Sequence, residues 1–254
     1  MIYLTGDTHN DFSKLSNKSL KKQGLKLTEN DYMIVTGDFG LCWAHDKTFD
    51  WNCKWFAERS FTTLWVQGNH ENYDMIAEYP LEEWHGGLVR HIVRDKVILL
   101  ERGQIFNIEG HTFFTFGGAA SHDILGGALD RNDPDFALKL QDRCDNWIPY
   151  RIVGESWWPQ ELPTAEEFQT GFDNLAKVDY KVDYVITHCC ATDLQMAIVH
   201  YLNKPSKADI LTDYFQKLEE KLQYKHWYFG HYHYYLQTDE KHTVLYDDII
   251  KLDE

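Results

Sequence analysis

The sequence predicts an α/β fold in which two sheets pack face to face and helices cover their outer faces. The first part of the chain alternates short hydrophobic runs with helical stretches, which is typical of parallel strands joined by crossover helices. Closely spaced β runs follow between Leu88 and Phe116, and such spacing favours antiparallel hairpins. Alternation of helices and strands then returns near Ala165. Parallel units on both sides of a β-rich middle predict two mixed sheets.

Each element of the opening unit is predicted from hydrophobic periodicity. Short apolar runs bounded by turn residues predict strands, and the stretches of helical period between them predict helices. In chain order we expect a strand from Ile2 to Thr5, a helix from about Ser13 to Lys22, a strand from Tyr32 to Thr36, a helix around Phe49 to Arg59, a strand from Thr62 to Val66 and a short helix near Tyr73 to Tyr79.

The later elements follow from the same signals. The β-rich middle contains the runs Leu88 to Val93, Val97 to Leu100, Gln104 to Ile108 and Thr112 to Phe116, with Glu109-Gly110 between the last two. After it we expect a helix from Ala165 to Ala176, a strand from Asp183 to Thr187, a helix from about Ala208 to Leu222, a strand from Trp227 to Phe229 and a closing β pair through Tyr246.

Composition places the chain among globular proteins. With 254 residues, of which 43% are hydrophobic and 15% aromatic, the chain can bury a large core and is neither disordered nor fibrous. No linker or repeat marks a boundary, so we expect one domain over residues 1–254, with an irregular, loop-rich insertion around residues 117–163 where periodicity is weakest.

Net charge, cysteine usage and the search for targeting signals limit the partners and the compartment that we expect for the protein. The formal net charge of -15 argues against tight binding to long nucleic acids. The five cysteines are scattered and show no CxxC spacing, so reduced thiols are expected. We find no signal peptide and no apolar stretch of about 18 residues, and therefore expect a soluble, cytoplasmic protein with no membrane partner.

Five short polar clusters, each at the end of a hydrophobic run, carry most of the functional information. They are Asp7-Thr8-His9, Gly37-Asp38, Gly68-Asn69-His70-Glu71, Thr187-His188 and Gly230-His231-Tyr232-His233. Clusters that follow successive parallel strands converge on one rim of a sheet, where open α/β folds place their chemistry. Their carboxylate, amide and imidazole donors suit two divalent metal ions.

The first two clusters supply the carboxylates. Asp7 and His9 are two residues apart, so on an extended backbone they face the same side and can share one metal ion. Asp38 follows the second strand, where a carboxylate can give one oxygen to each of two ions about 3.5 to 4 Å apart. We expect Asp38 to bridge the two ions; the alternative is that it caps the next helix.

The third cluster is the most specific of the five. Asn69 offers a neutral carbonyl ligand, whereas His70 projects differently and can reach a substrate. A histidine with a pKa near neutrality can donate a proton to a leaving alkoxide or form a hydrogen bond with a phosphoryl oxygen. Glu71 is expected to be structural, as a cap of the helix that follows.

Histidines complete the set. His231 and His233 share a face on an extended segment, so each can bind a different ion, and His188 closes the preceding strand. Cys189 and Cys190 are disfavoured as ligands because neighbours on an extended segment point to opposite faces. The histidines without such a setting are His45, His85, His91, His111, His200, His226 and His242.

Taken in order, the motifs DxH, GD, GNHE, a histidine that ends a strand, and GHxH resemble those of the calcineurin-like metallophosphoesterase superfamily, from Asp7 to His233. The resemblance implies a four-layer α/β/β/α sandwich of two mixed sheets flanked by helices, the metallo-dependent phosphatase-like fold. It also implies one metal site made by Asp7, His9, Asp38 and His233, a second made by Asp38, Asn69, His188 and His231, and His70 as the catalytic histidine.

Two segments depart from the phosphoprotein phosphatases of that superfamily, which carry GDxxDRG and RGNHE. The corresponding segments here are Gly37-Asp38-Phe39-Gly40-Leu41 and Gln67-Gly68-Asn69-His70-Glu71, so both arginines that would grip a substrate phosphate are missing, as is the second aspartate. We therefore expect a bacterial-type phosphoesterase rather than a protein Ser/Thr phosphatase.

The expected reaction is hydrolysis of a phosphomonoester or phosphodiester. Two divalent cations would generate hydroxide from a bridging water for in-line attack, with His70 assisting the leaving oxygen. Manganese is the first candidate, and iron, zinc and nickel also accept these donors. Bound cations reverse the charge locally, so the acidic chain can still take a small phosphorylated or nucleotide-like substrate.

Two other functions and one structural question stay open. The protein could be a noncatalytic metal-binding scaffold that contacts partners, which a missing ligand or catalytic histidine would favour, or it could be a nuclease, which the acidic charge disfavours. Residues 117–163 could form a lid or contact phosphate through Gly117 to Asp123 or Arg131, or simply pack on the fold through Trp157 and Trp158. We assign no substrate contact to that segment.

Overall fold

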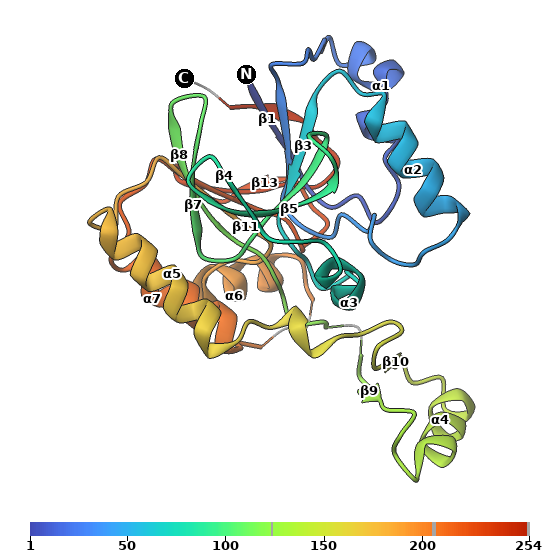
Figure 1. The fold of residues 1–254 in the computed structure, drawn as a ribbon. Coiled ribbons are helices and arrows are strands. Elements are labelled where there is room, and N and C mark those ends of the chain that lie inside the picture. The colour runs from blue at the N-terminus through green and yellow to red at the C-terminus, as the bar shows by residue number, and fades with distance from the viewer. Residues whose placement is uncertain (123, 205–206, 253–254) are drawn as a thin grey trace.

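Two mixed sheets form the centre of the protein in the computed structural model, which describes residues 1–122, 124–204 and 207–252. The sheets face each other, and helices cover both outer faces (Figure 1). The predicted four-layer α/β/β/α sandwich is confirmed.

The first sheet has seven strands in the order β15-β1-β2-β3-β6-β5-β4. Its central strands β1, β2, β3 and β6 run parallel, while β15, β5 and β4 are added antiparallel to their neighbours. The strands are β1 (Ile2–Thr5), β2 (Tyr32–Val35), β3 (Thr62–Trp65), β4 (Glu82–Trp84), β5 (Gly87–Val93), β6 (Val97–Leu100) and β15 (Ile250–Lys251). Its helical elements are η1 (Ser13–Leu15), α1 (Asn17–Lys22), α2 (Lys47–Ala57) and α3 (Tyr73–Ala77).

The second sheet has six strands in the order β13-β14-β12-β11-β8-β7. Here β14, β12, β11 and β8 are parallel, and β13 and β7 are antiparallel at the two edges. The strands are β7 (Gln104–Ile108), β8 (His111–Phe116), β11 (Tyr184–Thr187), β12 (His226–Phe229), β13 (Leu236–Gln237) and β14 (His242–Val244). Its helical elements are η2 (Pro159–Glu161), α5 (Ala165–Lys177), α6 (Thr192–Tyr201) and α7 (Ile210–Glu219).

Three hydrophobic layers hold the four structural layers together. Alternate residues of a strand point to opposite faces, so in β1 Ile2 and Leu4 lie in the core between the sheets, while Tyr3 lies in the core under the helices of the first sheet. The second sheet follows the same rule, with Ile186 of β11 between the sheets and Val185 against the helices of the second sheet. This double burial explains why the strands are continuous apolar runs.

Two details of the predicted elements differ in the structure. The predicted helix from Ser13 to Lys22 is split, because Ser16 is extended and caps α1 by accepting a hydrogen bond from the Ser19 backbone N–H. Each of the two predicted hairpins is antiparallel, but β5 and β6 belong to the first sheet and β7 and β8 to the second, so the chain crosses between the sheets after β6.

The segment of residues 117–163 contains more secondary structure than its sequence suggests. Helix α4 (Phe136–Asp145) lies between β9 (Ala128–Leu129) and β10 (Arg151–Ile152), which pair in parallel. Together they form a lobe, residues 126–156, that projects from the sandwich (Figure 1). Helix α4 buries no residue, so it needs no apolar stripe and leaves no periodic signal in the sequence.

Tryptophan packing holds the C-terminal base of the lobe, as one of the two alternatives for this segment proposes. The Trp158 indole is buried and donates a hydrogen bond from Nε1 to Asp74 Oδ2 at 2.9 Å. Arg131 instead forms an exposed ion pair with Glu155, also of the lobe. Asp123 of the same segment lies outside the described residues.

The buried Arg102 ties both ends of this segment to the sandwich. Its guanidinium donates to the carbonyl oxygens of Gly117 at 2.8 Å and Gln160 at 2.8 Å. These hydrogen bonds fix the start and the end of the insertion, independently of the position of the lobe between them.

Two expectations about the whole chain can be compared with the described residues. All five cysteines are free, and three of them, Cys42, Cys189 and Cys190, are buried. In the ranges that the structure covers, every helix is too short or too polar to cross a bilayer.

Candidate metal centre

Five loops at one rim of the two sheets hold the residues that the sequence singles out. Three of these loops follow the adjacent parallel strands β1, β2 and β3, and two follow the adjacent parallel strands β11 and β12. Parallel neighbours end on the same side, which is why the loops meet. The structure brings together all eight predicted positions: Asp7, His9, Asp38, Asn69, His70, His188, His231 and His233.

One group of four residues forms a compact donor cluster. Ligand atoms of Asp7, His9, Asp38 and His233 all lie within 4.8 Å of one another. The His9 and His233 Nε2 atoms are 2.9 Å apart, and His233 Nε2 is 3.2 Å from Asp7 Oδ2. These are the four residues that the resemblance assigned to the first ion, and their mutual distances suit donors that converge on one cation.

Asp38 lies between this cluster and a second group. Its Oδ2 is 3.8 Å from His9 Nε2, while its Oδ1 is 3.3 Å from His188 Nε2. His188 in turn lies against His231, with ring centroids 5.0 Å apart. The two carboxylate oxygens therefore face different groups, as a bridging ligand requires. The alternative role does not apply, because the N-cap of α2 is Asp46.

Three of the predicted ligand atoms are buried without a hydrogen-bond partner. They are Asp7 Oδ2, Asn69 Oδ1 and His188 Nε2. Buried polar atoms are nearly always satisfied, so three such atoms without a hydrogen-bond partner at one rim call for a specific explanation. A carboxylate oxygen, an amide oxygen and an imidazole nitrogen can all bind divalent cations, so the residues present fit a metal site.

The tautomer of His188 is fixed by the backbone. Its Nδ1 lies 2.7 Å from the Thr36 carbonyl oxygen, which can only accept, so Nδ1 carries the proton and donates it. Nε2 is then the atom that faces Asp38. A second hydrogen bond that orients the ring in this way is typical of histidines that bind metals.

Burial and charge shift the pKa values of the donors in opposite directions. Burial lowers the pKa of the His231 imidazole well below its ordinary value, so this ring is neutral. Burial opposes protonation of His188 as well, but the Asp38 and Asp7 carboxylates and the hydrogen bond to the Thr36 carbonyl together outweigh it and raise the pKa of His188 to about 9. In the same pair, burial would raise the pKa of Asp38, yet His188 and the neighbouring histidines hold it well below its usual range.

Several ligand positions have an unusual backbone. His9, Asp38, His231 and His233 have φ values of 45°, 45°, 71° and 51°, in the left-handed region that residues other than glycine rarely adopt. Such conformations cost free energy and cluster at functional sites, where surrounding structure enforces them. Here they turn the chain sharply after β1, β2 and β12, so that the side chains point back towards the rim.

Glycines of the motifs make room for ligands from other strands. A Cβ atom on Gly37 would lie 2.1 Å from His188 Nδ1, and one on Gly68 would lie 2.0 Å from Asp38 Oδ1. Gly37 also has a φ of +100°. The glycine of one cluster is therefore required by the ligand of another, which explains the GD and GN pairs in physical terms.

Backbone N–H groups fix the two carboxylates. The His70 N–H donates to Asp38 Oδ1 at 2.8 Å, and the His231 N–H donates to Asp7 Oδ1 at 3.1 Å. Each carboxylate is thus held by the loop that carries a neighbouring histidine, and the second oxygen of Asp7 stays directed at the cluster.

Glu71 is structural, but its predicted role as a helix cap is wrong. The cap of α3 is Asn72, whose side chain accepts from the Met75 N–H. The buried Glu71 carboxyl instead points back to the loop after β2, where it accepts from the Phe39 N–H at 2.7 Å and the Gly40 N–H at 3.2 Å. Because β2 and β3 are parallel neighbours, a residue after β3 can reach the loop after β2 and fix the position of Asp38.

Comparison with known families agrees with this geometry. The family model described as calcineurin-like phosphoesterase matches residues 1–235, which contain every candidate ligand. The chain belongs to the calcineurin-like phosphoesterase family. Among solved structures, this chain is similar to a phosphopantetheinyl hydrolase from Mycobacterium tuberculosis, with 14% sequence identity and a TM-score of 0.41. The match covers 96% of this chain and 87% of the hydrolase chain. No curated protein matches the chain.

The phosphoesterase also contains supporting residues that sequence reasoning missed. Ser121 accepts a hydrogen bond from Asn69 Nδ2 at 3.3 Å and donates its hydroxyl to Glu161 Oε2 at 2.6 Å. The carboxylate accepts from the Ser121 N–H as well, at 2.9 Å. Since Nδ2 is engaged with Ser121, the amide oxygen of Asn69 must face the rim. No spacing in the sequence relates these three residues.

A half-buried lysine supports the first loop of the phosphoesterase. Lys14 Nζ donates to the carbonyl oxygens of Gly6 at 3.0 Å, Asp7 at 2.8 Å and Tyr246 at 2.7 Å. The Tyr246 ring stacks on His233, with centroids 5.0 Å apart. Lys14 therefore links the backbone of one candidate ligand to the residue that packs on another.

Proposed function

We propose that this phosphoesterase hydrolyses a small phosphomonoester or phosphodiester in a reaction that depends on two divalent metal ions. The observation that carries this proposal is the set of buried, unpartnered donors Asp7 Oδ2, Asn69 Oδ1 and His188 Nε2. Leaving a buried polar group unsatisfied costs about 1–3 kcal/mol. A bound cation would offset that cost at all three atoms.

The ligand sets follow from the two groups at the rim. One ion would be held by Asp7, His9, Asp38 and His233, and the other by Asp38, Asn69, His188 and His231. The chemistry that such a pair of ions supplies is Lewis acidity towards phosphoryl oxygens and a lower pKa for a water molecule. Manganese is the first metal to test, followed by iron, zinc and nickel.

His70 is the residue that we assign to the leaving group. It is partly exposed, and its ring centroid lies 5.2 Å from that of His9, so it borders the donor cluster on the solvent side. Its backbone N–H is bonded to Asp38, which fixes the loop while the imidazole faces outward. From there it can donate a proton to the departing alcohol oxygen.

The cysteines near the fold's core are poor nucleophiles. Burial raises the pKa of Cys42 and Cys189 well above the ordinary thiol value, so their thiolates are scarce at neutral pH. We therefore favour a mechanism in which water attacks phosphorus directly over one with a covalent cysteine intermediate.

The experiment that tests this function uses two chromogenic esters. Protein treated with EDTA and then resupplied with each metal is assayed on p-nitrophenyl phosphate and bis-p-nitrophenyl phosphate. We expect hydrolysis to depend on added metal, and the ratio of the two rates to separate monoesterase from diesterase. Absence of hydrolysis of both esters with every metal would reject the proposal and favour a noncatalytic scaffold.

A further inference from the structure

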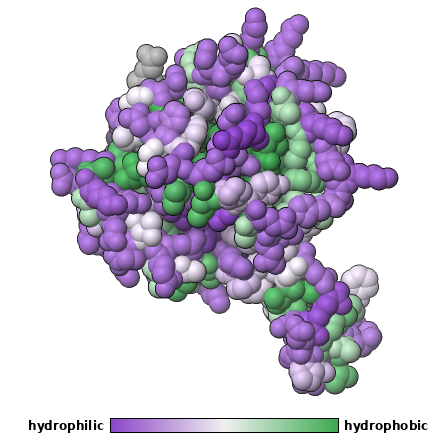
Figure 2. Space-filling model, viewed as in Figure 1, coloured by the Kyte–Doolittle hydropathy of each residue, from purple (hydrophilic) through white to green (hydrophobic). Residues whose placement is uncertain are grey.

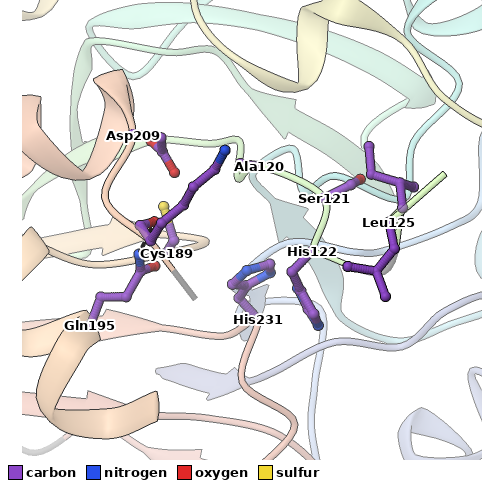
Figure 3. Close-up of a pocket in the computed structure, with 10 residues that line it drawn as sticks. Ala120, Ser121, His122, Leu125, Cys189, Gln195, Asp209 and His231 are labelled. Carbon is purple, nitrogen blue, oxygen red and sulfur yellow. Dashed lines mark hydrogen bonds between the residues drawn. The ribbon is translucent and has the colours of Figure 1, made fainter. Parts of the chain in front are cut away.

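A cavity of about 550 Å³ opens beside His231. One wall comes from the start of the 117–163 segment and includes Ala120 and Leu125, and the opposite wall includes Cys189. Figure 3 shows His231 and His122 between these walls. Their ring centroids are 5.2 Å apart. Since His231 is also a candidate metal ligand, the cavity adjoins the second ligand group of the metal centre.

Two polar side chains of the cavity walls, Gln195 and Ser121, already have hydrogen-bond partners within the protein. Gln195 accepts from the Tyr232 hydroxyl at 2.9 Å and donates to the Lys207 carbonyl oxygen at 3.1 Å. Ser121 donates to Glu161, as described above. A ligand with many hydrogen-bonding groups would have to break these bonds, so the walls favour a less polar one.

Four other residues of the wall are apolar or neutral. Ala120, Ile124, Leu125 and Cys189 line the cavity, and burial keeps the Cys189 thiol neutral by raising its pKa. The Leu125 side chain is 84% exposed. Apolar contact with a ligand would remove this side chain from water.

Among the described residues that line the cavity, the two charged ones at its polar end have opposite signs. Lys207 and Asp209 both line it and carry opposite charges. Asp209 caps α7 by accepting from the Leu211 and Thr212 N–H groups. Burial raises the pKa of its carboxyl, and the Lys207 ammonium opposes that shift, which indicates that the two charges act on each other. An ionic end group on the ligand would be attracted by one and repelled by the other.

We propose that this cavity binds the alcohol part of the substrate and selects phosphoesters whose alcohol is mainly apolar and uncharged. The inference rests on the proposed function, because the phosphoryl group must lie at the metal centre, whose second ligand group includes His231. In the reaction, a water oxygen bonds to phosphorus and releases a proton to solvent, the bond from phosphorus to the alcohol oxygen breaks, and that oxygen takes a proton from His70, which regains one from solvent. The alcohol is then released from the cavity.

A homologous series of alkyl esters tests the proposal. Ethyl, n-butyl and n-hexyl phosphates have leaving oxygens of similar acidity, so their rates compare binding rather than chemistry. They are used as monoesters or as symmetrical diesters, whichever class the p-nitrophenyl assay identifies. We expect kcat/KM to rise with chain length, by up to about fourfold for each buried methylene. Calorimetry with n-hexylphosphonate and ethylphosphonate, which are not hydrolysed, should show tighter binding of the longer chain.

Two leucine variants localise the effect. Leu125→Asn places an amide on the cavity wall, whereas Leu138→Asn makes the same change at a leucine of helix α4 that is 73% exposed. The surface of the projecting lobe, to which α4 belongs, mixes hydrophobic and hydrophilic side chains (Figure 2). Leu125→Asn should lower kcat/KM for the hexyl ester at least fivefold more than for the ethyl ester, and Leu138→Asn should preserve the ratio.

The possible failures can be told apart. Equal kcat/KM values along the alkyl series, or equal losses of kcat/KM in the two variants, would overturn the cavity assignment. The proposed function would still stand in that case if the p-nitrophenyl esters were hydrolysed in a metal-dependent reaction. If no ester is hydrolysed with any metal, both proposals fall.

Discussion

The Nε2 atoms of His9 and His233 lie 2.9 Å apart, although 224 positions separate the two residues in the chain. At that distance the two nitrogens cannot both carry protons without repulsion, so at least one presents a lone pair. Asp7 Oδ2 lies 3.2 Å from the same His233 nitrogen and has no hydrogen-bond partner. Electron-rich atoms held together by loops from two different sheets are an arrangement that a cation stabilises.

Asp38→Asn should abolish metal occupancy at this centre. The substitution keeps the shape of the side chain but removes the charge whose two oxygens face His9 and His188. Elemental analysis of the purified variant should find less than one metal ion per chain. Retention of two ions would contradict the bridging role of Asp38. Asp46→Asn, at the N-cap of α2, is a matched control that should keep its metal.

His70→Ala should lower turnover by about 100-fold or more while leaving metal content intact. The backbone N–H that donates to Asp38 is retained in alanine, so the carboxylate stays in place. Steady-state rates and elemental analysis are measured on the same preparation. His45→Ala, which removes an exposed histidine paired with Glu78, should have the wild-type rate. Normal turnover in His70→Ala would exclude a role in proton donation.

Ser121→Ala should weaken the binding of one of two metal ions by about tenfold or more. Without the hydroxyl, Asn69 Nδ2 loses its acceptor and the amide is free to rotate its oxygen away from the rim. Ser121→Thr retains a hydroxyl and should recover most of the affinity. Calorimetric titration with Mn²⁺ should therefore separate the two variants, and identical affinities would show that Ser121 does not orient Asn69.

Removal of metal should make stability depend on pH through His188. Its pKa is raised from 6.5 to about 9, chiefly by Asp38 against the effect of burial, so its contribution is full below about pH 6.5 and is lost as the pH rises through about 9. The free energy of unfolding of EDTA-treated protein should fall by about 1–3 kcal/mol over that range. Denaturant titrations of wild type and His188→Gln measure it, and a fall of equal size in the variant would assign the effect to another group.

The strands and the meeting of the clusters were predictable because both depend on regular patterns. The observed bounds of β1, Ile2–Thr5, are the predicted ones, since a strand buried on both faces must be a continuous apolar run. Once β1, β2 and β3 are parallel neighbours, their terminal polar residues must share a rim. That the eight residues bind metal and act in catalysis stays a prediction.

The sequence was less informative where the structure depends on contacts between residues that no sequence periodicity relates. Helix α6 (Thr192–Tyr201) was missed because its buried positions include the polar Gln195, which weakens the apolar stripe. The hydrogen bonds of Ser121 with Asn69 and Glu161 join three distant parts of the chain. Glu71 was misassigned because its nearest helix follows it in sequence, whereas its partners lie 31 and 32 positions earlier.

The distribution of the two sheets along the chain has a consequence for biosynthesis. The first sheet is built mainly from the N-terminal strands, yet its edge is completed by β15, the last strand, which pairs with β1. Asp7 would leave the ribosome early and His233 late, so a nascent chain could not assemble the full donor set. A cation captured at the rim would then lock two separately formed halves together, and metal supply would influence the yield of folded protein as well as its activity.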